Sequence, residues 1–180
     1  MAEPLTRRRT PVIPATVGVR LLPPLARFIL RADTHAIGRA CAALGIDFAH
    51  GPCRASRGGS RSALWLGPDE YLLLAPEAET DAVARTLEET LQGEPHSLVD
   101  VSHRQTALEL SEARAADILN SGCPLDLHVS AFPVDMCTRT VFAKAEIVLW
   151  RTAADVFHLE VWRSFTDYVA HFINEVVSEY

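Results

Sequence analysis

The chain contains two segments with the same order of elements, and this repeat limits most strongly what it can fold into. Leu64–Leu66, a turn, Tyr71–Leu74 and an amphipathic stretch are matched by Leu149–Arg151, a turn, Val156–Leu159 and a second amphipathic stretch. Short apolar runs bounded by turn residues predict strands, and a 3.6-residue apolar period predicts helices. Two strand–turn–strand–helix units therefore predict an α+β fold with antiparallel sheets and a pseudo-duplicated architecture. Such units are common, so the repeat alone does not establish a duplication.

The same criteria predict the other elements. Helices are expected over 33–44, 79–92, 111–119 and 165–178, and strands over 63–66, 71–75, 97–101, 104–110, 137–142, 146–151 and 155–162. Asp33 and Ser111 are the expected N-caps, and Ser164 with Asp167 has the spacing of a capping box. The glycine-rich segment 51–60 is predicted to be a flexible connection, because no Lys-Ser/Thr follows its glycines.

The first 25 residues have a different composition from the rest of the chain. Pro11, Pro14, Pro23 and Pro24 disfavour regular helix, so residues 1–25 are predicted to be an extended arm and residues 26–180 a single α+β domain. A disordered tail is the alternative, but apolar residues favour an arm that lies along a partner. The expected partner contacts are Arg7, Arg8, Arg9, Val12 and Ile13.

Length and charge exclude several classes of protein. The 180 residues suffice for one compact domain, and the net charge of −6 does not favour nucleic-acid binding. No apolar run approaches the roughly 20 residues of a membrane-spanning helix, and no secretory signal is recognised, so we expect a cytoplasmic protein. The four cysteines contain no Cys-x-x-Cys pair, which indicates free thiols; His50 and Cys53 lack a second ligand pair, so no metal site is expected.

No catalytic motif is found, although Asp100, Ser102 and His103 contain the residue types of a nucleophile triad. In an extended segment Asp100 and Ser102 share one face and His103 points to the other, so Ser102 and His103 cannot align for proton transfer. We expect Asp100 and Ser102 instead to fix the corner between two strands by hydrogen bonds to the backbone. His158, placed to share a face with Glu160, is interpreted as a surface or satisfied sheet histidine, and the three tryptophans as core or interface residues.

From about Leu64 onward the sequence resembles the gamma-subunit family of heterotetrameric sarcosine oxidases, whose fold is related to the folate-binding domain of glycine-cleavage T-proteins. The resemblance rests on five stretches. They are Trp65-Leu-Gly-Pro-Asp-Glu-Tyr-Leu-Leu73, Leu98-Val-Asp-Val-Ser-His-Arg-Gln-Thr-Ala107, Ile118-Leu-Asn-Ser-Gly-Cys-Pro-Leu-Asp-Leu127, Thr138-Arg-Thr140 and Trp162-Arg-Ser-Phe-Thr-Asp-Tyr168.

The resemblance implies a non-catalytic subunit with alpha, beta and delta partners, chiefly alpha, whose folate-binding half it would support. The complex would demethylate sarcosine oxidatively to glycine, hydrogen peroxide and a one-carbon unit passed to tetrahydrofolate. FAD, FMN, NAD, tetrahydrofolate and zinc are expected in the partner subunits and none in this chain. Where T-proteins carry paired aspartates, this chain has Val141–Leu149 with Glu146 as the nearest carboxylate, so no folate turnover is expected.

Three alternatives stay open. The complex could be an N-methylglutamate dehydrogenase type, because the substrate of such a complex binds outside the gamma subunit. The chain could instead be a stand-alone folate-dependent transferase, or a scaffold without a flavoenzyme partner.

Overall fold

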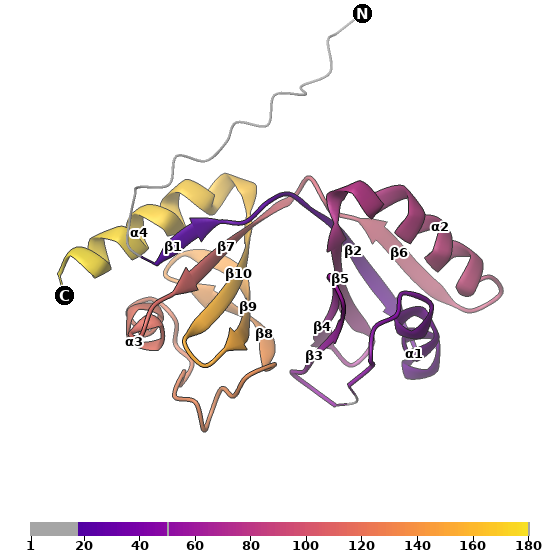
Figure 1. Ribbon diagram of the computed structural model, residues 1–180, viewed down its shortest axis with the longest axis horizontal. Coiled ribbons are helices and arrows are strands. Elements are labelled where there is room, and N and C mark those ends of the chain that lie inside the picture. The colour runs from indigo at the N-terminus through magenta and orange to yellow at the C-terminus, as the bar shows by residue number, and fades with distance from the viewer. Residues whose placement is uncertain (1–17, 50, 180) are drawn as a thin grey trace, which may run out of the picture.

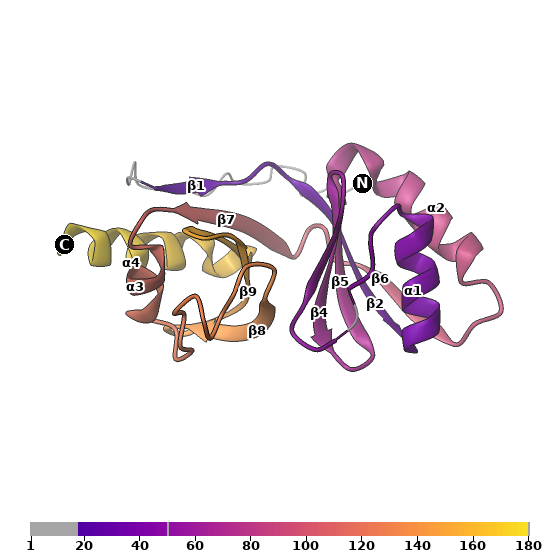
Figure 2. The same cartoon turned by 60° about the horizontal axis from the view of Figure 1, so that its bottom comes forward.

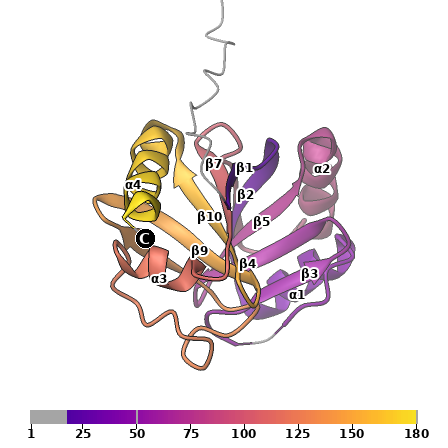
Figure 3. The same cartoon turned by 60° about the vertical axis from the view of Figure 1, so that its left-hand side comes forward.

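The computed structural model describes residues 18–49 and 51–179, which form four layers in the order helices, sheet, sheet, helices (Figures 1 and 3). The predicted contacts Arg7, Arg8, Arg9, Val12 and Ile13 lie outside the described residues. Each sheet has five antiparallel strands, in the orders β3-β4-β5-β2-β6 and β1-β7-β10-β9-β8, called sheet B and sheet A. The α+β class with antiparallel sheets is thereby confirmed.

Sheet B and its helices occupy the first half of the described chain. The elements are β2 (Leu25–Ala32), α1 (Thr34–Ala43), β3 (Ala55–Gly58), β4 (Arg61–Gly67), β5 (Glu70–Pro76), the 3₁₀ turn η1 (Glu77–Glu79), α2 (Thr80–Thr90) and β6 (His96–Asp100). The predicted N-cap is confirmed, because the Asp33 side chain accepts a hydrogen bond from the N–H of Ala36 at 2.8 Å. Gly45, at φ 68°, ends the helix in the left-handed region.

Sheet A and its helices repeat that order. The elements are β7 (Gln105–Ser111), α3 (Ala115–Asn120), β8 (Cys137–Phe142), β9 (Ala145–Ala153), β10 (Val156–Trp162), η2 (Arg163–Phe165) and α4 (Thr166–Ser178), with β1 (Val19–Leu21) at the edge. The pairing β9–β10–β7–β1 in sheet A therefore corresponds to β4–β5–β2–β6 in sheet B. The two predicted strand–turn–strand–helix units are β4, β5 and α2 in one half and β9, β10 and α4 in the other.

The two edge strands β1 and β6 are exchanged between the halves. β1 precedes β2 of sheet B along the chain but pairs with β7 of sheet A, where Val19 lies opposite Leu110. β6 precedes β7 of sheet A but pairs with β2 of sheet B, where Val99 lies opposite Ile29. Figures 1 and 2 show the two connections crossing between the sheets. The halves are therefore joined by two short connections, residues 22–24 and 101–104.

Three local predictions were wrong. Residues 55–58, expected in a flexible connection, form strand β3, which pairs with β4. Ser111 does not cap a helix: it is the last residue of β7, and its N–H donates to the carbonyl of Gly18 next to β1. Helix α3 starts four residues later, at Ala115, without a side-chain cap. The capping box is not formed either, since α4 continues from η2 and Phe165 is its N-cap. Strand β2 was not predicted at all.

Each sheet presents one face to its helices and the other to the opposite sheet. The helix-side cores are large and apolar, with Phe28, Leu30 and Leu73 in sheet B, and Leu108, Phe157 and Leu159 in sheet A. A smaller cluster between the sheets includes Leu64, Leu72, Cys137, Val148 and Trp150. No helix in the described part of the chain is both long and apolar enough to cross a bilayer.

Candidate functional site: the polar layer between the sheets

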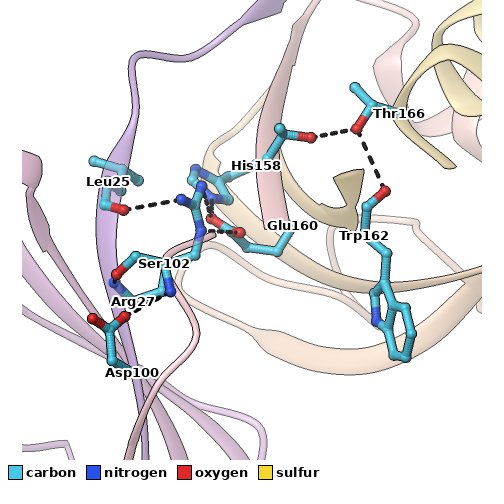
Figure 4. Close-up of polar contacts among 9 residues, drawn as sticks. Leu25, Arg27, Asp100, Ser102, His158, Glu160, Trp162 and Thr166 are labelled. Atoms are coloured by element: carbon cyan, nitrogen blue, oxygen red, sulfur yellow. Dashed lines mark hydrogen bonds and ion pairs between the residues drawn. The ribbon is translucent and has the colours of Figure 1, made fainter. Parts of the chain in front are cut away.

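The centre of the space between the sheets holds a buried ion pair. Arg27 on β2 donates from Nε to Oε2 of Glu160 on β10 at 2.6 Å, and from Nη2 to Oε1 at 3.2 Å (Figure 4). Both side chains are almost fully buried, at 2% and 0% exposure. The residues are far apart in sequence and come from different sheets, so this bidentate contact joins the two halves.

His158 completes the cluster from the same face of β10. Its Nε2 lies 2.8 Å from Glu160 Oε1. Because an ionised carboxylate only accepts hydrogen bonds, Nε2 carries the proton. The His158 ring also packs against Trp150, with ring centroids 5.7 Å apart, and the guanidinium of Arg57 in sheet B lies over the Trp150 ring, 4.5 Å from its centroid. Of the two roles predicted for His158, the structure shows the buried sheet histidine with a hydrogen-bond partner.

The Asp100–His103 corner holds Arg27 in place. The N–H of Ser102 donates to Asp100 Oδ1 at 2.8 Å, and Ser102 Oγ accepts from the N–H of Arg27 at 2.9 Å. The N–H of Val101 donates to the carbonyl of Arg27 at 2.8 Å, and Arg27 Nη1 donates to the carbonyl of Leu25 at 3.1 Å. The predicted role of Asp100 and Ser102 in fixing the corner is therefore confirmed. In addition, the corner holds the backbone of Arg27 by hydrogen bonds.

The carboxyl of Glu160 stays ionised in this setting. Burial alone raises its pKa, but the hydrogen bond from His158 and the charge of Arg27 outweigh burial, so the pKa of Glu160 lies below its ordinary value. Both carboxylate oxygens are engaged by these two partners. A group held in this way is not available as a general base toward a bound molecule. The cluster joins the two sheets.

The space between the sheets opens at one end into a cavity of ≈ 80 Å³, called here the seam pocket. Its walls include Ile29, Leu66 and Leu72 from sheet B and Gln105, Val148 and Trp162 from sheet A. Small-molecule sites usually have volumes of about 300–1,000 Å³, so this cavity is too small for a pterin or flavin. Glu146, which also lines it, is exposed and forms an ion pair with Arg139 at 3.4 Å. The described residues do not fit a folate at this place.

A second hollow of ≈ 290 Å³ lies over sheet B beside the start of α1. Its described lining consists of aromatic, proline and glycine residues with the hydroxyl of Thr34, and among these residues the phenol of Tyr71 is the only ionisable group. Burial raises the pKa of Tyr71, so the phenol is neutral at physiological pH.

The cysteines do not form a redox or metal centre among the described residues. All four are free thiols, and burial raises the pKa of Cys41 and of Cys137 to about 12. No group of three metal-ligating side chains occurs within 18–49 and 51–179. His50, one half of the His50/Cys53 pair, lies outside the described residues.

The chain is similar to known proteins in both sequence and structure. Residues 31–179 match the sarcosine oxidase, gamma subunit family. The sarcosine oxidase subunit gamma of Corynebacterium sp. (strain P-1) is 35% identical over 164 residues, which cover 91% of this chain and 76% of that protein. The solved heterotetrameric sarcosine oxidase from Corynebacterium sp. U-96, in complex with pyrrole 2-carboxylate, contains a chain with a TM-score of 0.82 and 31% identity, covering 89% of this chain and 83% of its own.

A more distant likeness concerns the fold alone. The glycine cleavage system aminomethyltransferase T from Bartonella henselae has a TM-score of 0.64 at 12% identity, over 87% of this chain and 45% of its own. This neighbour confirms the expected T-protein-like fold. The profile match, the identity to the Corynebacterium subunit and the shared fold together show that the chain belongs to the sarcosine oxidase gamma subunit family.

Proposed function

We propose that this chain is the non-catalytic gamma subunit of a heterotetrameric, sarcosine-oxidase-type flavoenzyme. Alpha, beta and delta subunits would be its partners, with alpha the principal one, and FAD, FMN, NAD, tetrahydrofolate and zinc would be held by them. The single observation that carries the proposal is the likeness to a chain of a solved heterotetrameric sarcosine oxidase, at 31% identity over 89% of this chain.

The buried polar cluster of Arg27, His158 and Glu160 supports the non-catalytic part of the proposal. In this chain the buried carboxylate of Glu160 is occupied by Arg27 and His158, and the Ser102 hydroxyl accepts from backbone. The seam pocket is too small for a folate. These polar side chains hold structural contacts within and between the sheets, which suits a subunit that stabilises the alpha subunit and its folate-binding half.

The test is co-purification from the native source or from co-expression of neighbouring flavoprotein genes. We expect the chain to elute with the large subunits, and the complex to oxidise sarcosine with production of hydrogen peroxide in the cytoplasmic fraction. Elution of the chain alone as a stable monomer would contradict the proposal. N-methylglutamate as the preferred substrate would keep the subunit role and change the complex.

The folate question has its own experiment. The purified chain is titrated with 5-formyltetrahydrofolate in a calorimeter, with an authentic T-protein as the positive control. We expect no binding at micromolar concentration. Tight binding by the isolated chain would favour a stand-alone folate protein.

A further inference from the structure

The surface around the seam pocket combines exposed aromatic, apolar and cationic side chains. Trp162, at the end of β10, is 42% exposed and forms one wall of the pocket. Phe165 and Tyr168 follow on η2 and α4, with 39% and 37% exposure and ring centroids 6.4 Å apart. These three residues are called the aromatic ridge. Contiguous exposed apolar side chains on a folded protein usually mark a contact surface.

Val99 extends this surface on the other side of the pocket. It lies opposite Ile29 in the β2–β6 pairing, so the two side chains share the face that looks into the pocket. Val99 is nevertheless 49% exposed, because β6 is the edge strand of sheet B. The apolar surface therefore continues from sheet B across the pocket to the aromatic ridge of sheet A.

Two arginines give the surface its charge. The guanidinium of Arg104 lies 5.5 Å from the ring of Trp162, and the N–H of Arg163 donates to the carbonyl of Arg104 at 2.9 Å, which places the two residues side by side. Both are exposed, and the ion pairs among the described residues include neither of them. In a chain with a net charge of −6, this is a local concentration of positive charge.

The pocket wall also holds an unsatisfied polar group. Gln105 is 7% exposed, and its Oε1 has no hydrogen-bond partner among the described residues. Buried amide oxygens in folded proteins almost always have a donor. The volume of ≈ 80 Å³ is too small for a cofactor, and the charged residues Arg104, Arg139 and Glu146 lie in the pocket lining beside the apolar ones.

We propose that the seam pocket, the aromatic ridge and Val99 form the docking surface for a large subunit of the complex. The partner covers the pocket and the aromatic ridge, and places carboxylates beside Arg104 and Arg163. Trp, Tyr and Arg are the residue types that dominate binding energy at protein interfaces. This inference rests on the proposed function, since it requires that a partner subunit exists.

The experiment is co-expression of the full chain with affinity-tagged large subunits, followed by measurement of the gamma chain retained. Trp162→Ala, Val99→Arg and the double change Arg104→Glu with Arg163→Glu are the test variants. Val129→Arg is the matched control for Val99, because Val129 is equally exposed at 49%, and Arg85→Glu on the outer surface of α2 is the control for charge. We expect each test variant to weaken retention on the order of tenfold or more, with both controls unchanged.

Hydrogen exchange of the unmodified complex provides a test that does not depend on variants. Amides of residues 98–105 and 162–168 should exchange more slowly in the complex than in the free chain. Normal retention of all test variants, absence of this protection, or a free chain that dimerises through this surface would overturn the docking surface while leaving the subunit role intact. If the unmodified chain is not retained by any large subunit, the proposed function itself fails.

Discussion

Sheet A and sheet B share one order of strands but assemble it differently along the chain. Sheet B is made from residues 25–100 without interruption, whereas sheet A combines 105–162 with the distant β1. Each sheet also receives its edge strand from the segment that leads into the other. The comparison teaches that the molecule is a duplicated architecture in which the sheet B copy is continuous along the chain, whereas the sheet A copy is incomplete without β1. The two sheets are held together by the apolar cluster between them, by the placement of β1 and by the buried Arg27–Glu160 pair.

The largest expected effect comes from breaking that ion pair. Glu160→Gln leaves the Arg27 charge buried without a counter-ion, and loss of one partner of a buried pair costs about 3–5 kcal/mol. The free energy of unfolding is measured by urea denaturation. Asp69→Asn is the control, because the Arg31–Asp69 pair is exposed and should contribute less than about 1 kcal/mol.

A double substitution separates attraction from the cost of burial. Arg27→Met together with Glu160→Leu removes both charges, so the variant should lose less stability than Glu160→Gln alone. Equal losses in the two variants would mean that the pair contributes through shape and not through charge.

Acid should reproduce part of the same effect. Since the folded-state pKa of Glu160 is lowered, its contribution is fully present above the unfolded-state pKa of about 4.3 and is lost as pH falls through the folded value. Stability measured from pH 7 downward should therefore decline below about pH 4. In Glu160→Gln this decline should be shallower; an identical profile would assign the acid sensitivity to other carboxylates.

Two glycines test how tightly each half is packed. A Cβ at Gly58 would lie 1.9 Å from the carbonyl oxygen of Gly45 in sheet B, whereas at Gly122 it would lie 2.9 Å from the ring of Phe142. Backbone yields less easily than a ring, so we expect Gly58→Ala to cost about 3 kcal/mol and Gly122→Ala about 1–2 kcal/mol in thermal unfolding.

Gly38→Ala is the control for those substitutions. Its Cβ would meet Phe48 at 3.6 Å, an ordinary contact, inside helix α1. The change should stabilise by about 0.5–1 kcal/mol because alanine is the better helix former. A larger loss at Gly122 than at Gly58 would reverse the comparison of the halves.

The smallest effect distinguishes the two short helices. Asp33 caps α1, whereas α3 has Arg114 at the N-cap without a side-chain hydrogen bond to its backbone. Asp33→Ala should cost about 1 kcal/mol, and Arg114→Ala should change stability by less than about 0.5 kcal/mol. The losses of stability are measured by thermal unfolding of both variants beside the unmodified chain, and an equal loss in the two variants would contradict this difference between the helices.

Local sequence patterns predicted the repeated hairpins and all four helices, because alternation and apolar period are visible within a dozen residues. They did not predict β2, since Arg27 and Arg31 interrupt its apolar pattern, and Arg27 is buried only because Glu160 meets it from the other sheet. The same reason explains why the sequence placed His158 beside Glu160 but did not reveal Arg27. The role of Ser111 was missed because its hydrogen-bond partner, Gly18, lies outside any local window.

The exchange of edge strands also sets an order of events during synthesis. Sheet B can be completed once residue 100 has left the ribosome, but β1 must wait until β7 has been made before Leu21 can face Leu108. At ~5–20 residues per second, that edge strand stays without its partner for several seconds. An unpaired strand is a template for wrong pairing. The nascent chain is therefore most open to misassembly, or to a chaperone, in the interval between its two halves.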